Sequence, residues 1–229
     1  MLIIGHRGIP SRIHENTLES FIAAAQSGAD LIELDIRRTA DEVAVAFHDP
    51  DIQTNDGATP IASLTYAELQ RKANALGFAV PTISETIKAL SKLKGILFEF
   101  KEPGYEQSII ENVCTFYSPS QVAFQSFDYQ IVTRLKERNP DLYVGLLLEK
   151  ESELNNAEAF CGDFLAPSLE LFRNNRSFFT EQKRRSRHLA VWTVNAPDQL
   201  QTCLADPLLD MLITNRCDLA RSLSKEISR

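Results

Sequence analysis

The sequence has few of the residues that typify disulfide-stabilised or metal-thiolate proteins. Its 229 residues include only four cysteines, Cys114, Cys161, Cys203 and Cys217. They are widely spaced and form no Cys-x-x-Cys pair, so neither a zinc site nor a redox pair is indicated. We expect each to be a single buried or half-buried thiol.

Long apolar runs and basic stripes are also missing. No run approaches the length of a membrane span. The first apolar run begins without a basic leader, so we expect no signal peptide, no stable membrane anchoring and a cytoplasmic location. The formal net charge of −7 argues against duplex nucleic acid as a partner. Such a surface attracts no anion from a distance, so an anionic substrate would need a local positive site.

What the chain does contain is a regular alternation of short apolar runs and helical stretches. Eight such strand–helix units at this length predict an α/β fold, a closed (β/α)₈ TIM barrel, in a single domain over residues 1–229. The expected strands are 3–5, 31–36, 95–100, 122–125, 143–148, 164–166, 189–194 and 211–214.

Residues 50–80 break this alternation. They follow a short extra strand at 43–47 and contain the run Thr54-Asn-Asp-Gly57, Pro60 and a short helix opened by Thr65 and Glu68. We interpret them as a small insertion on the rim after the second strand. Elsewhere, Asn16 is expected to cap the first helix in a capping box with Glu19, and the helix that begins near residue 81 is expected to reach about residue 93.

The second expected strand carries two acids on one face. Residues two apart on a strand share a face, so Glu33 and Asp35 point one way while Ile32, Leu34 and Ile36 point the other. Two adjacent acids are costly to bury without a cation or another partner. This pair therefore indicates a site rather than a core.

Further polar candidates fall where expected strands end, which is the rim that carries the active site in barrels. Strand 43–47 returns one more candidate, a histidine, to that rim. The set comprises His6 and Arg7 after the first strand, Glu33 and Asp35 on the second, Glu99 and Lys101 on the third, Trp192 on the seventh, and His48.

Short motifs run in order through nearly the whole chain. They are His6-Arg7-Gly8, Glu15-Asn16-Thr17, Glu33-x-Asp35, His48-Asp49, Phe98-Glu-Phe-Lys101, Gln125-Ser-Phe127, Trp192-Thr-Val-Asn195 and Ile213-Thr-Asn215. In order and spacing they resemble the glycerophosphodiester phosphodiesterase family. The resemblance implies a TIM barrel and a divalent metal that together cut the phosphodiester of deacylated phospholipids.

The resemblance also implies that Glu33, Asp35 and Glu99 hold one metal ion. This all-oxygen set suits Mg²⁺ or Ca²⁺ rather than zinc, with Mn²⁺ as a further candidate. The alternative is a dry ion network in which these acids pair with Arg7, Arg37 or Lys101. Glu15 is either a further ligand, an acid that orients the site, or only a helix-start charge.

His6 and His48 supply the proton chemistry that the resemblance implies. Imidazole titrates near neutral pH, and cleavage needs one proton taken and one given. We favour His6 as the base and His48 as the acid, and the attacking oxygen belongs either to water or to a substrate hydroxyl that first gives a cyclic phosphate. Arg7 and Lys101 are the expected phosphate contacts, and Lys101 alternatively pairs with Glu99 or Glu33.

The sole tryptophan, Trp192, matches a family residue that lines the glycerol side of the pocket, although as a sequence feature it is more often core. Two departures from the family occur near the last strand. Members often carry Asp and Pro in place of Asn215 and Cys217, and a Gly is common just before Asp210. We expect both departures to change only a local loop, away from the acids and histidines.

These observations predict metal-dependent hydrolysis of glycerophosphodiesters to glycerol 3-phosphate and an alcohol. The expected partner is a small soluble substrate, and the expected state is a monomer or weak homodimer. The alternatives are a phosphodiesterase of lysophospholipids, a metal-dependent lyase or aldolase on the same barrel, and a non-catalytic barrel that binds a phosphate ester. A lyase leaves the two histidines without a shared task, whereas a dead barrel predicts loss of an acid or histidine that this chain keeps.

Overall fold

Eight parallel strands form a closed barrel in this computed structural model, which describes residues 1–91 and 93–227. β1 pairs with both β2 and β11, and these two pairings close the sheet. The predicted TIM barrel is confirmed. Its strands are β1 (Leu2–Gly5), β2 (Leu31–Arg38), β6 (Ile96–Phe100), β7 (Val122–Ser126), β8 (Tyr143–Leu148), β9 (Phe164–Pro167), β10 (His188–Val191) and β11 (Met211–Thr214).

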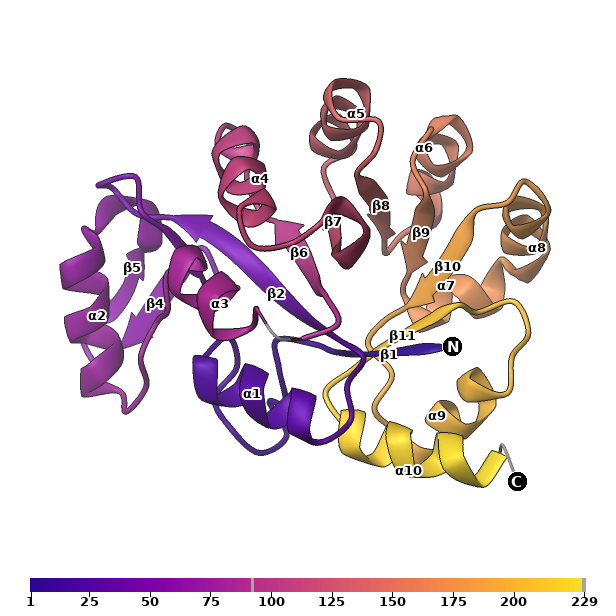
Figure 1. The fold of residues 1–229 in the computed structure, drawn as a ribbon, viewed down its shortest axis with the longest axis horizontal. Coiled ribbons are helices and arrows are strands. Elements are labelled where there is room, and N and C mark those ends of the chain that lie inside the picture. Colours follow the sequence, from indigo (N-terminus) through magenta and orange to yellow (C-terminus); the bar gives the residue numbers. More distant parts are fainter. Residues whose placement is uncertain (92, 228–229) are drawn as a thin grey trace.

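Helices follow the strands and surround the barrel (Figure 1). The segment expected to hold one helix between β9 and β10 holds two, α7 and α8. The helices outside the insertion are α1 (Leu18–Gln26), α3 (Ile83–Ala89), α4 (Glu106–Cys114), α5 (Tyr129–Arg138), α6 (Leu154–Ala159), α7 (Leu169–Asn174), α8 (Arg176–Arg184), α9 (Pro197–Leu204) and α10 (Cys217–Ile227). Among the described residues, none of the helices has both the length and the apolar character needed to cross a membrane.

The pleat of the strands divides the core into two layers. One large cluster combines strand residues such as Ile32 and Phe98 with helix residues such as Phe21 and Ile87, so it lies between barrel and helices. A second cluster fills the barrel interior and is built from strand residues two apart. Its buried members are Ile4, Leu97, Ala123, Leu147, Phe164, Ala166, Ala190, Met211 and Ile213.

Gly145 makes room for Phe164, the largest of the buried side chains in this interior. It is paired in register with Phe164 on β9, and a Cβ atom added to Gly145 would overlap the Phe164 ring. We therefore expect Gly145→Ala to destabilise the barrel by about 1–3 kcal/mol, the usual cost of overpacking. Denaturant unfolding would measure this. Adding Phe164→Leu should recover part of the loss, and strictly additive losses in the double variant would contradict the assignment.

The insertion after β2 has its own small core. It contains β3 (Ala44–Ala46), which is antiparallel to β2, the hairpin of β4 (Asp51–Thr54) and β5 (Gly57–Pro60), and α2 (Tyr66–Ala75). Figure 1 shows α2 and this hairpin set to one side of the barrel. The helix start was predicted correctly, since Thr65 and Glu68 form a capping box. The hairpin was not predicted.

Three local predictions were wrong. Thr17, not Asn16, caps α1 by accepting from the Ser20 amide, so the capping box with Glu19 is not formed. The helix expected to reach residue 93 ends at Ala89, with residue 92 outside the described part. Two of the four thiols, those of Cys114 and Cys161, are exposed rather than buried or half-buried.

Candidate active site

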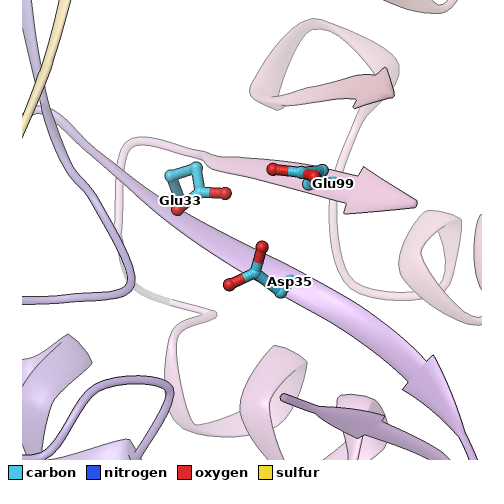
Figure 2. A group of neighbouring side chains, drawn as sticks. All are labelled: Glu33, Asp35 and Glu99. Carbon is cyan, nitrogen blue, oxygen red and sulfur yellow. The ribbon is translucent and has the colours of Figure 1, made fainter. Parts of the chain in front are cut away.

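Three acids meet at the carboxyl end of the barrel. Glu33 and Asp35 lie on β2 and Glu99 on β6, and their carboxylates point toward one another (Figure 2). The register pairs Asp35 with Glu99, so the inward faces of the two strands bring these side chains together. One ligand atom from each acid lies within 4.8 Å of the other two. The side chains are 0%, 0% and 5% exposed.

This acid set has the chemistry of a site for a hard cation. Oε2 of Glu33 accepts a hydrogen bond from the Arg7 amide at 2.9 Å, but its Oε1 is buried without a hydrogen-bond partner. Burial, together with the charges of Asp35 and Glu99, raises the pKa of Glu33 well above its ordinary value. These acids offer only oxygen ligands, which Mg²⁺ and Ca²⁺ prefer. A bound cation would also favour the ionised form of Glu33.

Two cations share the cluster with the three carboxylates. Arg7 Nε lies 3.2 Å from Asp35 Oδ2, Lys101 Nζ lies 2.8 Å from Asp35 Oδ1, and Lys101 also pairs with Glu99. Burial alone would raise the pKa of Asp35, but Lys101 and Arg7 outweigh it and lower the pKa to about 2. Burial and the Asp35 charge raise the pKa of Glu99 to about 7. Arg7 and Lys101 therefore stabilise the charged form of Asp35, whereas Glu33 and Glu99 favour their protonated forms in the absence of further positive charge.

Arg37 does not join this network, contrary to one of the pairings considered from the sequence. Its Nε donates to the His48 carbonyl at 2.8 Å, and its Nη1 pairs with Glu102. Glu15 lies apart from the three acids and accepts from Arg7 Nη1 at 3.0 Å. Its place in the structure is therefore that of a partner to Arg7, which fits the orienting role considered from the sequence.

Asn16 contributes to the site rather than to a helix cap. Its φ of 54° lies in the left-handed region, which asparagine tolerates better than most residues. The side-chain Nδ2 donates to Asp35 Oδ2 at 2.8 Å, while the Asp35 amide donates back to Asn16 Oδ1. Asn16 thus holds the carboxylate of Asp35 in place. The signal in the sequence that could have indicated this role is the place of Asn16 in the motif Glu15-Asn16-Thr17.

His6 is held by an asparagine on the neighbouring strand end. Its Nδ1 lies 2.7 Å from Oδ1 of Asn215. The backbone N–H of Asn215 in turn donates to Asn195 Oδ1 at 2.9 Å. With the amide oxygen facing the ring, Nδ1 carries the hydrogen and Nε2 is left as the basic nitrogen. Burial, followed by the nearby charge of Arg7, lowers the pKa of His6 to about 4.

The contact with Asn215 corrects an expectation from the sequence. Asn215 was placed on a loop away from the acids and histidines, yet it contacts His6 directly. β1 and β11 are the first and last strands, and closure of the barrel pairs them with Gly5 opposite Thr214. The residues that follow these two are therefore neighbours. Treating the first and last strands as adjacent would have found this contact.

His48 stands at the end of β3, as expected. Its Nδ1 lies 2.7 Å from Oδ1 of Asp49, and a carboxylate can only accept, so Nδ1 donates and Nε2 remains available. Burial lowers the pKa of His48, while the charge of Asp35 and the hydrogen bond to Asp49 act in the opposite direction. The ring is about one-third exposed, with a side-chain exposure of 32%.

A cavity of about 270 Å³ connects these groups. Trp192 lies just beyond β10 rather than on it, and its Nε1 donates to the Ala166 carbonyl at 2.7 Å. The ring of Phe127 meets Trp192 edge-on at 5.4 Å. The residues that line the cavity are His6, Arg7, Glu33, His48, Glu99, Lys101, Gln125, Phe127, Leu147, Glu149, Trp192 and Ile213.

A second cavity, of about 360 Å³, opens on the other side of His48, between residues 14–16 before α1 and the insertion. His48 lines both cavities, and Glu15, Asp49 and Phe78 are among the other residues of the second. A larger cavity beside α4 and α5, of about 540 Å³, is lined by none of the candidate residues. Cavity size therefore does not locate this site, whereas its chemistry does.

Comparison with known proteins shows which family this chain resembles. The family model of the glycerophosphoryl diester phosphodiesterase family matches residues 6–219. The chain is 28% identical over 162 residues to the glycerophosphodiester phosphodiesterase of Caldanaerobacter subterraneus subsp. tengcongensis, covering 65% of this chain and 67% of that protein.

Solved structures agree with this match. The glycerophosphodiester phosphodiesterase of Thermotoga maritima superposes with a TM-score of 0.84 at 25% identity, covering 97% of this chain and 98% of that one. A phosphodiesterase of Oleispira antarctica, solved in complex with the product sn-glycerol-3-phosphate, has the same fold, with a TM-score of 0.84 at 22% identity over 98% of this chain and 97% of that one. The chain therefore belongs to the glycerophosphoryl diester phosphodiesterase family and is an enzyme of that family.

Proposed function

We propose that this enzyme hydrolyses glycerophosphodiesters to glycerol 3-phosphate and an alcohol, with one divalent metal and with His6 and His48 as its proton-transfer groups. The observation that carries the proposal is one cavity of about 270 Å³ lined by two buried carboxylates, two cations and two histidines, with the third buried carboxylate, that of Asp35, beside the other two. Family membership supports the substrate class.

Glu33, Asp35 and Glu99 would hold the metal, with Mg²⁺, Ca²⁺ and Mn²⁺ as candidates. The unpartnered Oε1 of Glu33 and the convergence of three buried carboxylates support this assignment. A bound divalent ion supplies positive charge that polarises a phosphoryl oxygen. Arg7 and Lys101, already beside the acids, contact the remaining phosphate oxygens and stabilise the negative charge that grows on phosphorus in the transition state.

The surroundings of the two histidines support different roles for them. His6 faces a neutral amide and has a pKa of about 4, so it is unprotonated at neutral pH and can accept a proton from the attacking oxygen at Nε2. His48 faces the carboxylate of Asp49, which favours the protonated ring and partly opposes the lowering of the His48 pKa by burial. This contrast supports His6 as the base and His48 as the acid.

The position of His48 supports a direction for the leaving group. The ring borders both the main cavity and the second cavity of about 360 Å³. A proton delivered from Nε2 of His48 would reach an alcohol oxygen at the boundary between them. The glycerol end of the substrate would then occupy the opposite wall, beside Trp192 and Phe127, and the alcohol would leave past His48.

The Asn215 contact gives a prediction for the pH dependence. Asn215→Asp places a negative charge 2.7 Å from His6 Nδ1, which stabilises the imidazolium and raises the pKa of His6. The basic form of His6 is lost as pH falls through that pKa. We therefore expect the acid limb of the kcat/KM profile to move to higher pH in the variant, by about one pH unit or more. An unmoved limb would show that His6 is not the base.

The function is tested by incubating the purified protein with glycerophosphocholine, glycerophosphoethanolamine and lysophosphatidylcholine, each with Mg²⁺, Ca²⁺, Mn²⁺ or excess EDTA. We expect metal-dependent release of glycerol 3-phosphate from the first two. Release of choline from lysophosphatidylcholine alone would instead favour the lysophospholipid alternative. Binding of glycerol 3-phosphate without turnover of any substrate would favour the non-catalytic barrel.

A further inference from the structure

Gln125 has no role in the proposed reaction, yet it lines the main cavity. It lies on β7 two residues after Ala123, a member of the barrel interior, so its side chain points inward. It is 1% exposed, and its Oε1 is buried without a hydrogen-bond partner. By contrast Gln182, which is equally buried, bonds both Glu158 and Arg187.

A buried amide without a partner normally costs stability. The cost comes from desolvating the amide without a compensating hydrogen bond. A leucine of similar shape would avoid that cost at this position. A group of this kind at a cavity wall is expected where a ligand supplies the missing partner. The amide of Gln125 is therefore poised for a hydroxyl, which can both donate and accept.

Glu149 lies on the same wall. It follows β8 directly, lines the same cavity as Gln125, and takes part in no ion pair among residues 1–91 and 93–227. A carboxylate accepts hydrogen bonds only. This wall also carries the rings of Phe127 and Trp192, whereas the cations Arg7 and Lys101 lie with the acids. The cavity thus has one ionic side and one side that combines aromatic rings with hydrogen-bond acceptors.

We propose that Gln125 and Glu149 are specificity residues that hold the two free hydroxyl groups of the substrate's glycerol end. The inference rests on the proposed function, and it adds the residues that recognise the glycerol end of the substrate. Two vicinal hydroxyls offer two donors to these two acceptors, and the carbon chain between them can lie on the rings of Trp192 and Phe127. An acylated or deoxygenated glycerol would leave the polar groups unpaired.

A competing role for Gln125 is that of a metal ligand, and metal-binding measurements distinguish it from hydroxyl binding. β7 pairs with β6 so that Gln125 stands opposite Glu99 in register. In that role the amide oxygen of Gln125 binds the metal instead of the substrate. A ligand role predicts weaker metal binding after Gln125→Leu, whereas a hydroxyl-binding role predicts unchanged metal binding.

The test compares two monophosphates of the same chain length by calorimetry in saturating Mn²⁺. These are sn-glycerol 3-phosphate and n-propyl phosphate, which lacks both hydroxyls. The ratio of their affinities isolates the glycerol end, because the phosphate is common to both. We expect Gln125→Leu and Glu149→Ala each to reduce this ratio about tenfold, the effect of one hydrogen bond, with propyl phosphate affinity nearly unchanged.

Gln182→Leu is the matched control. It removes a buried glutamine that has partners, so we expect it to lower the melting temperature and leave the affinity ratio unchanged. Gln125→Leu should keep or raise the melting temperature, because it removes an unpaired polar group. A fall in melting temperature equal to that of Gln182→Leu would make Gln125 a structural residue and overturn the proposal.

Two other results would also overturn it. One is an unchanged affinity ratio in both cavity variants, and the other is weaker Mn²⁺ binding by Gln125→Leu in the absence of any phosphate. Failure of the proposed function is separate, since it would appear as no hydrolysis of any glycerophosphodiester by the wild-type enzyme. Hydrolysis by the wild type with full discrimination in both variants would leave the function standing and remove this inference.

Discussion

His6→Ala and His48→Ala are each expected to lower kcat by about 10²–10⁴-fold, the usual contribution of a positioned acid or base. The reason is that each ring has its Nδ1 held by a partner, Asn215 or Asp49, while each lines the main cavity. Steady-state hydrolysis of glycerophosphocholine measures the effect. Neither variant should change metal affinity greatly, because neither ring is among the three acids that meet.

The leaving group separates the two roles. A p-nitrophenyl ester of glycerol phosphate needs no protonation of its departing oxygen, so His48→Ala should recover most of its activity on that substrate. His6→Ala should not, because the attacking oxygen still needs a base. Equal recovery of both variants, or recovery of His6→Ala alone, would contradict the assignment. His188→Ala is the matched control, since that ring lines another cavity, beside Tyr143.

Glu33→Gln is expected to produce the second large loss, with kcat/KM reduced at least 10²–10³-fold, about the effect of losing one electrostatic contact to the transition state. Glutamine keeps the shape of the side chain and its bond from the Arg7 amide but removes the charge that the metal would use. Excess EDTA should abolish the activity of the wild type, and added Mn²⁺ or Mg²⁺ should restore it. Glu111→Gln, an exposed change on α4, is the control.

Stability should move in the opposite direction in the metal-free protein. Burial and neighbouring acids raise the folded-state pKa of Glu33 and bring that of Glu99 to about 7. A carboxyl whose pKa is raised on folding stabilises the fold at low pH and loses that contribution as pH rises from the unfolded value of about 4.5. We expect Glu33→Gln to melt at or above the wild-type temperature in EDTA at pH 7.

Metal should reverse this order. A ligand present at 100 times its dissociation constant stabilises the fold by about 2.7 kcal/mol, so Mn²⁺ should raise the wild-type melting temperature. Glu33→Gln should show little or no such rise. A variant that is less stable than the wild type in EDTA, and equally stabilised by Mn²⁺, would show that Glu33 serves the fold as an ion-pair partner rather than the metal.

The barrel and its acids could be predicted because their signals are local. Eight alternations of strand and helix determine a closed barrel at this length, and the two-residue spacing of Glu33 and Asp35 requires a shared face. The position of Glu99 followed from the rule that barrel sites lie where strands end. These inferences need only the order of elements along the chain.

The missed features depend on contacts between distant segments. Asn215 reaches His6 only because closure pairs the first strand with the last. Asn16 was misread as a cap because asparagine suits both a helix start and a left-handed turn, and only the position of Asp35 distinguishes them. The burial of Gln125 without a partner is likewise a property of the assembled barrel, since no spacing in the sequence indicates it.

The most direct test of the metal site and its histidines is an anomalous difference map from crystals grown with Mn²⁺ and sn-glycerol 3-phosphate. The structure predicts one strong peak among the carboxylates of Glu33, Asp35 and Glu99, with the phosphate beside it between His6 and His48. A peak elsewhere, or none at full Mn²⁺ occupancy of the protein in solution, would contradict the proposed metal-dependent phosphodiesterase site.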